Sequence, residues 1–260
     1  MLKILKYSFF DLMRSRWSYV YFLFYLLLGS VLLFLNNDLS KAVITLMNVI
    51  VVLVPLIGTI FGVMYYYNSK EFTELLLAQP VKRSSIFLGQ YFGVATSLSM
   101  SLIIGLGLPF VFYGIFNSTA IWDFSLLLVT GTFLTLIFTA LAFVIALANE
   151  NKIKGFGYAI LLWLFVAVIY DGLFLMALIY FEDYPLDKFS LAATMLNPVD
   201  LSRVLILLKL DISALLGYTG AVFQKFFGTS LGIILSSAIL FILVIIPVYI
   251  INRMAKRKDF

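Results

Sequence analysis

The stretch YYYNSKEFTELLLAQPVKRSSIFLGQY (residues 65–91) decides how the rest of the chain is organised. Long apolar segments lie on both sides of it, yet the stretch itself is rich in charge around a run of leucines. Its charged residues are Lys70, Glu71, Glu74, Lys82 and Arg83. Such a stretch is typical of a short amphipathic helix that stays outside the hydrocarbon while its neighbours cross it.

The helix is predicted from about residue 69 to residue 79. Pro80 ends it, because proline lacks an N–H donor and disfavours helical geometry at the residue before it. Ser84 or Ser85 is expected to cap the next helix. Two interpretations stay open from the pattern, an interfacial helix resting on the bilayer or a docking helix for a soluble partner. Residues at helical spacing form its predicted apolar face: Phe72, Leu75, Leu76 and Gln79.

Composition places the chain in a membrane. Of its 260 residues, 63% are hydrophobic and 12% are charged, whereas soluble domains have about 25% charged residues. The sequence contains 0 His and 0 Cys, which excludes imidazole bases, thiol nucleophiles and the usual transition-metal sites. We therefore predict no catalytic residue, no metal site and no cofactor bound by this chain.

Six segments are long enough to cross a bilayer core of about 30 Å, which needs roughly 20 apolar helical residues. They lie within one transmembrane domain, residues 1–260, and the expected fold class is an all-α membrane protein. The six predicted spans are residues 18–36, 42–66, 91–116, 122–148, 156–180 and 229–252.

Basic residues set the expected orientation, because cytoplasmic segments carry an excess of Lys and Arg. With the N-terminus inside, 13 of the 18 Lys and Arg residues lie in the inner segments. Both termini are therefore predicted to be cytoplasmic, in a multi-pass membrane protein. The anionic inner leaflet accounts for the basic charge, and no nucleic acid is needed to explain it.

The N-terminal segment, residues 1–17, is predicted to form a helix lying in the membrane plane. Its basic residues Lys3, Lys6 and Arg14 would face lipid phosphates. The apolar stripe consists of Leu2, Leu5, Phe9, Leu12 and Met13, with Arg16 beside it.

The outer loop, residues 181–228, contains a second helical signal. Asn197 is expected to cap a helix with Pro198 at its first position and Asp200 in its first turn. The helix that carries Arg203 is strongly apolar but too short to span. It is either a re-entrant helix that closes a pathway on the outside or a docking surface for an exported partner protein.

Asp171 is the only acidic residue in the interior of a predicted apolar span, since Asp123 lies at the very start of another. A carboxylate in hydrocarbon is costly, so Asp171 should face the bundle, a watery cavity or an interface. A contact to cargo and a snorkelling or helix-bonded acid are both open. Separately, glycines four residues apart predict close helix contacts at 58–62, 89–93 and 228–232.

The segment ELLLAQPVKRSSIFLGQ (residues 74–90) resembles E-L-L-L-x-x-P-V-x-R-x-x-x-x-x-G-K of the ABC-2 permeases, the membrane subunits of one class of ABC transporter. The chain is most similar to the Nos-type permeases of nitrous oxide reductase maturation. Two positions depart from the pattern, since Glu71-Phe72 replaces Gly-Thr and Gln90 replaces a basic residue. A second match is LNPVDLSRVLILLKLD (residues 196–211), which resembles the outer segment of the same permeases.

The resemblance implies a type V exporter-like transmembrane domain with an N-terminal elbow helix and a cytoplasmic coupling helix at residues 68–84. The coupling helix would sit in a cleft of a separate ATPase subunit that binds ATP and Mg; this chain has no G-x-x-x-x-G-K-[ST] loop of its own. Two copies of the chain would work with two ATPase copies. The implied coupling residues are Lys70, Glu71, Glu74, Leu75, Leu76, Leu77, Pro80 and Arg83.

The Nos-type resemblance further implies export of a sulfur-containing species for copper-site assembly, with a periplasmic partner protein. The alternative cargoes are a lipid, a drug or a gliding-type component. A stand-alone secondary carrier is less favoured, because it predicts several ionisable residues within spans and an internal repeat.

Overall fold

The computed structural model describes residues 1–36, 38–181, 184, 186–209 and 230–257. The described chain is built of helices, and six of its segments are long and apolar enough to cross a membrane, as predicted. The fifth of these is interrupted by a π-helical stretch, η2. The segments are α2 (Arg16–Asn36), α3 (Leu39–Asn68), α5 (Arg83–Phe112), α6 (Ile121–Ala148), α7–η2–α8 (Lys152–Leu164, Phe165–Ile169, Tyr170–Tyr180) and α12 (Ser230–Arg257).

Two helix ends differ from the prediction for residues 91–116. α5 begins eight residues earlier, at Arg83, and its N-cap is Lys82, not Ser84 or Ser85. At the other end α5 stops at Phe112, because Gly114 takes a left-handed φ of 84° that breaks the helix before the short η1 (Ile115–Asn117). The serines therefore lie inside the first turn of α5.

α3, α5 and α6 form the core of the bundle. In the most apolar part of each helix, the share of residues that is buried is 50% for α3, 56% for α5 and 61% for α6. The corresponding figures are 28% for α2, 22% for α12 and 11% for α7–α8, so these helices turn broad apolar faces outward. Because a multi-pass membrane protein has lipid as its solvent, such faces need no protein partner to be stable.

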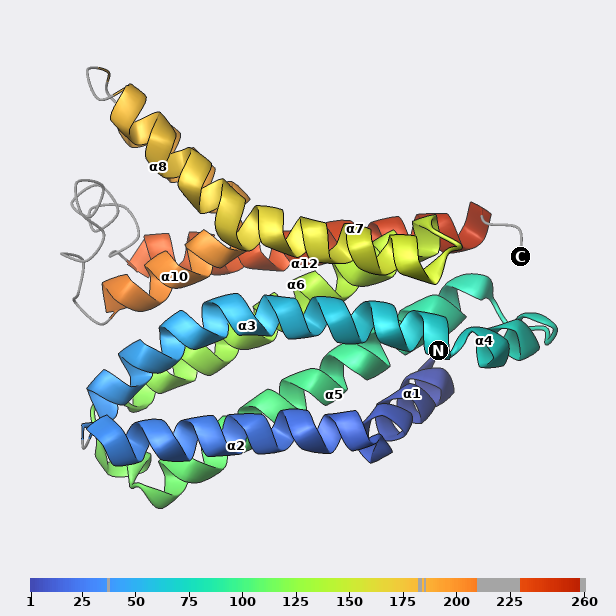
Figure 1. Ribbon diagram of the computed structural model, residues 1–260, viewed down its shortest axis with the longest axis horizontal. Helices are drawn as coiled ribbons and strands as arrows, with labels where there is room; N and C mark the ends of the chain where they lie inside the picture. The colour runs from blue at the N-terminus through green and yellow to red at the C-terminus, as the bar shows by residue number, and fades with distance from the viewer. Residues whose placement is uncertain (37, 182–183, 185, 210–229, 258–260) are drawn as a thin grey trace.

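The two ends of the bundle carry different elements (Figure 1). α1, α4 (Lys70–Leu77), the N-terminus and the end of α12 lie together at one end, here called the α4 end. The far ends of α8 and α10 (Pro198–Lys209) lie at the opposite end. Both ends of the described chain therefore lie at the α4 end.

Glycines allow the closest helix contacts, as their spacing predicts. A Cβ added at Gly62 would lie 2.7 Å from Ala142 Cβ of α6. A Cβ added at Gly93 would lie 2.6 Å from Ser8 Cβ of α1 (Leu2–Arg14). Backbones approach this closely only where no side chain intervenes. For the third predicted pair, 228–232, residue 228 lies outside the described residues.

The face of α1 that packs against the bundle differs from the predicted stripe. Ile4, Ser8 and Leu12 are buried, whereas Leu2 is 80% exposed. The buried face is shifted from the predicted stripe and overlaps it at Leu12, because close contact with the glycines of α5 favours a small residue such as Ser8. The helix ends at Ser15, whose ψ of 144° bends the chain into α2.

α9 (Asp187–Leu196) and α10 form a sharply bent pair, with 112° between their axes. α10 packs against α3, α6 and α12, and Leu201 and Ile206 are fully buried. This burial favours the re-entrant interpretation of the helix over a docking surface. The rest of the predicted outer loop, residues 182, 183, 185 and 210–228, lies outside the described residues.

Candidate functional site: the α4 surface and a polar cluster at the opposite end

α4 is anchored to the bundle by its only buried residue, Thr73. The Thr73 hydroxyl donates to the carbonyl oxygen of Ser69 at 2.8 Å and accepts from Gln90 Nε2 of α5 at 2.7 Å. Gln90 is completely buried. A helix of eight residues has little stability of its own, so this tertiary bond holds α4 in place.

Phe72 fixes α4 to α1 through a stacked aromatic pair. Its ring centroid lies 4.5 Å from that of Tyr7, with 24° between the ring planes. Stacking of this kind contributes about 0.5–1.5 kcal/mol beyond area burial. α4 is therefore in contact with both α1 and α5.

The outward side of α4 carries most of the predicted coupling residues. Leu75 is 68% exposed, and Lys70, Glu71 and Glu74 are also exposed. Leu76 and Leu77 are half-buried. The predicted single face is therefore divided, because Phe72 packs on α1 while Leu75 points outward.

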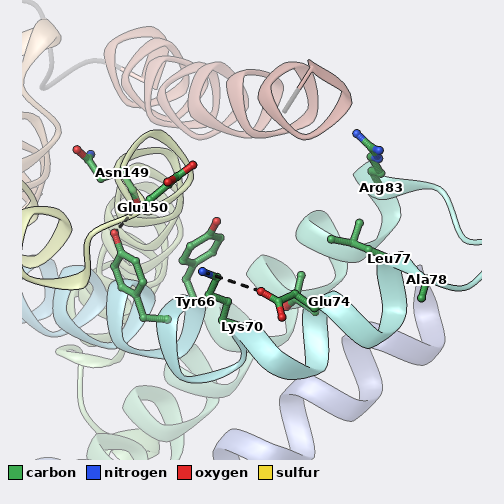
Figure 2. Close-up of a pocket in the computed structure, with 10 residues that line it drawn as sticks. Tyr66, Lys70, Glu74, Leu77, Ala78, Arg83, Asn149 and Glu150 are labelled. Carbon is green, nitrogen blue, oxygen red and sulfur yellow. Dashed lines mark hydrogen bonds and ion pairs between the residues drawn. The ribbon is translucent and has the colours of Figure 1, made fainter. Parts of the chain in front are cut away.

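Lys70 and Glu74 form an ion pair of 3.9 Å across one turn of α4, drawn as a dashed line in Figure 2. Both side chains are more than half exposed, at 61% and 58%. Solvent screens such a pair, so it contributes no more than a few tenths of a kcal/mol to stability. Both charges remain free to be met by a partner surface.

The turn after α4 is set by Pro80. The N–H of Val81 donates to the carbonyl oxygen of Gln79 at 2.7 Å, which closes a three-residue turn around the proline. α4 ends at Leu77, three residues before Pro80 and two residues before the predicted end. Arg83 then opens α5, so the exposed Pro80 reverses the chain toward the bundle.

A cavity of about 600 Å³ lies between α4 and the turn that joins α6 to α7 (Figure 2). Asn149 and Glu150 of that turn line it on the side away from α4, and the Asn149 amide is turned back to the carbonyl oxygen of Ile145. Its lining residues are Tyr66, Tyr67, Lys70, Thr73, Glu74, Leu77, Ala78, Arg83, Asn149 and Glu150.

The sequence did not predict that the α6–α7 turn lines this cavity opposite α4. The Tyr67 hydroxyl donates to the Asn149 carbonyl oxygen at 2.7 Å, and Lys152 Nζ donates to Asn68 Oδ1 at 3.1 Å. These bonds hold the α6–α7 turn beside the end of α3. The available signal was the polar run Asn149–Lys152 in an otherwise apolar region.

In the half of the bundle away from α4, Asp171 near the start of α8 and Arg203 of α10 meet in a polar cluster. Arg203 Nη1 donates to Asp171 Oδ2 at 2.6 Å and lies 3.7 Å from Asp200 Oδ1. Asp171 thus faces the bundle and is paired, one of the possibilities that the sequence left open. The sequence had singled out both Asp171 and Arg203 without pairing them.

Asn197 joins this cluster to the break in the fifth span. Its Oδ1 accepts from the N–H of Val199 at 2.9 Å, so Asn197 caps α10 as predicted. Its Nδ2 donates to Asp200 Oδ2 at 2.8 Å and to the Val166 carbonyl oxygen at 2.9 Å. Val166 lies in η2, and a π-helical turn widens the backbone so that a carbonyl can bond a side chain. Pro198 is the first residue of α10, with Asp200 in its first turn.

Comparison with known proteins adds an independent observation. No family model matches the chain. Over 136 residues the chain is 26% identical to the probable ABC transporter permease protein NosY of Stutzerimonas stutzeri. This alignment covers 50% of this chain and 49% of that protein. Over 220 residues it is 24% identical to the protein of the same name in Pseudomonas aeruginosa PAO1, covering 78% of this chain and 80% of the relative.

These similarities support an ABC transporter permease. Such a subunit carries out transport and is not itself an enzyme, and ABC permeases in general work with an ATPase partner. The six apolar helices agree with a multi-pass membrane protein. The alignment with the first relative spans about half the length of that protein.

Proposed function

We propose that the chain is the transmembrane subunit of an ATP-driven ABC exporter of the ABC-2 type, in which α4 is the coupling helix. The observation that supports this proposal is how the side chains of α4 are divided between the bundle and the outside. The helix is fastened to α1 and α5 on one side and presents Leu75 with Glu71 and Glu74 on the other. An apolar residue ringed by charges is the usual pattern of a protein docking site.

The proposed assembly contains two copies of this chain and two copies of a separate ATPase, which holds ATP and Mg. α1 is then the elbow helix, and both termini lie in the cytoplasm of a bacterium whose inner membrane contains the protein. ATP drives the cycle because the ATPase binds it with different affinity in the two states of the transporter.

Three connections would transmit a movement of α4 to the membrane domain. α4 follows α3 directly after Ser69, Gln90 connects it to α5, and Tyr7 connects it to α1. In the half of the bundle away from α4 we propose that the Asp171–Arg203 pair holds α10 against α8 as an outer gate. Opening the gate would require α10 and α8 to separate.

Mutation of the exposed face of α4 tests the docking role. The Leu75→Asp and Glu74→Lys variants should lose co-purification with the proposed ATPase subunit, while the membrane domain still inserts. Loss of a docking anchor weakens binding by about 30-fold or more. Leu35→Asp is the matched control, because Leu35 is 67% exposed but lies near the end of α2, opposite α4. Equal co-purification of all variants would reject the docking role.

For cargo, we propose from the Nos-type resemblance that the exporter moves a sulfur-containing species outward for the copper site of nitrous oxide reductase, with a periplasmic partner protein. A strain lacking this chain should make nitrous oxide reductase without the spectrum of its sulfur-containing copper centre. A normal spectrum would favour a lipid, drug or gliding-type cargo and would leave the ABC-exporter proposal intact.

A further inference from the structure

A second cavity at the α4 end is lined by cations from two helix ends. It has a volume of about 500 Å³ and lies between the start of α5 and the last turns of α12. In Figure 2, α12 (pale red) passes near the tip of Arg83. The described residues that line this cavity include no acid: they are Lys82, Arg83, Ser84, Asn252 and Lys256.

The charge of this cavity favours an anionic ligand. Lys82 and Lys256 come from different helix ends and line the same space, so an anion between them is attracted by both charges. Lys and Arg both bind phosphate oxygens, and Ser and Asn side chains supply further hydrogen-bond donors. A second basic cavity, lined by Lys3, Lys6 and Arg14 of α1, differs because the carboxylate of Asp11 also lines it.

The surface of α12 beside the cavity indicates what else the ligand carries. Ile245, Tyr249, Asn252 and Lys256 are spaced by four, three and four residues, which places them on one face of the helix. Ile245 and Tyr249 are 48% and 62% exposed, whereas Asn252 and Lys256 line the cavity. One stripe of α12 therefore changes from exposed apolar side chains to a basic pocket.

We propose that this cavity binds the phosphate headgroup of an anionic phospholipid, whose acyl chain lies along the Ile245–Tyr249 face of α12. Inorganic phosphate satisfies the cations but makes no use of the apolar stripe, so the lipid matches more of the surface. The bound lipid joins the start of α5 to the end of α12, at the end of the bundle that carries α4. This site is additional to the proposed docking role of α4 and does not depend on it.

Native mass spectrometry of the full chain in detergent tests the proposal, with dioleoylphosphatidylglycerol, dioleoylphosphatidylcholine and inorganic phosphate as probes. We expect the wild type to retain phosphatidylglycerol in preference to phosphatidylcholine. The Lys82→Ser/Lys256→Ser variant should bind phosphatidylglycerol at least about tenfold more weakly, because each cation near an anionic headgroup contributes to affinity. Inorganic phosphate at millimolar concentration should not displace the lipid.

The matched control is Lys41→Ser/Lys188→Ser, which removes the same charge from two exposed positions that line neither basic cavity and should change binding by less than about twofold. Equal loss in both double variants would overturn the proposal, since it would indicate general attraction to a basic surface. Equal retention of the two lipids, or displacement by inorganic phosphate, would overturn it as well. If the double variant at 82 and 256 does not fold, Lys256→Gln alone should still weaken binding by about fivefold, and unchanged binding would reject the site.

Discussion

Gln90 Nε2 of α5 donates a hydrogen bond of 2.7 Å to the hydroxyl of Thr73, the single buried residue of α4. A buried side chain of a membrane helix thus holds the short helix that faces the proposed ATPase. Since Thr73 also bonds to Ser69, replacing Gln90 leaves the hydroxyl with one partner.

We predict that Gln90→Leu lowers the free energy of unfolding by no more than about 1 kcal/mol, because the lost hydrogen bond is partly offset by removal of the buried Gln90 Oε1, which has no hydrogen-bond partner among the described residues. ATPase co-purification should persist, because the exposed face of α4 is untouched. Cargo-dependent ATP hydrolysis should fall, since α5 no longer follows α4 closely. Thermal denaturation in detergent and the ATPase rate of the reconstituted complex measure these two effects.

Thr73→Val and the double variant complete a mutant cycle for this bond. A coupling free energy near 1 kcal/mol between positions 73 and 90 would support it. Additive effects would show that the bond does not link the two helices, and the proposed route through α5 would be wrong.

The Arg203–Asp171 pair should stabilise the contact between α10 and α8. The two side chains are 28% and 32% exposed, and their charged atoms are only 2.6 Å apart. Arg203→Leu is therefore expected to destabilise the protein by about 1–2 kcal/mol. Reversing the pair, Asp171→Arg with Arg203→Asp, should restore part of the loss. Thermal denaturation and protease sensitivity of α10 provide the measurements.

Lys70→Leu serves as the control for this prediction. It breaks an ion pair of 3.9 Å between side chains that are 61% and 58% exposed, and should change stability by less than about 0.5 kcal/mol. If Arg203→Leu costs no more than Lys70→Leu, the pair is not a structural lock, and the outer-gate proposal loses its support.

Local features were the ones that the sequence predicted best. Asn197 caps α10 by bonding the N–H of Val199, two residues away, so residue order alone determines the contact. Arg203 and Asp171 are 32 residues apart, and Gln90 and Thr73 are 17 apart. Their pairing depends on how α10 meets α8 and how α4 folds back on α5, which no local pattern contains.

α1 shows why apolar periodicity is less informative in a membrane than in water. Lipid and the protein interior are both apolar, so an exposed Leu2 and a buried Leu12 look alike in sequence. Ser8 marks the buried face by its small size rather than by hydrophobicity, opposite Gly93. The glycine pair in α5 was therefore the better guide to where α1 sits.

Gly93 and Gly107 of the same helix should respond oppositely to alanine. A Cβ at Gly93 would lie 2.6 Å from Ser8 Cβ and 2.9 Å from the Leu5 carbonyl oxygen, so α1 must shift. We expect Gly93→Ala to cost about 1–3 kcal/mol of stability. A Cβ at Gly107 meets no atom within 4 Å, so Gly107→Ala should be neutral or stabilising by up to about 1 kcal/mol. Thermal denaturation distinguishes them, and equal melting temperatures would contradict the close contact of α1 with α5.

Orientation can be read directly, because the chain contains 0 Cys and any introduced thiol is labelled without background. Leu75 of α4 is 68% exposed, and Phe116, between α5 and α6 at the opposite end, is 67% exposed. A membrane-impermeant maleimide should label Leu75→Cys in inside-out vesicles and Phe116→Cys in right-side-out spheroplasts. Basic residues concentrated at the α4 end set this expectation. The reverse pattern would put α4 outside the cell, where no ATP-driven subunit could reach it, and the coupling role would be excluded.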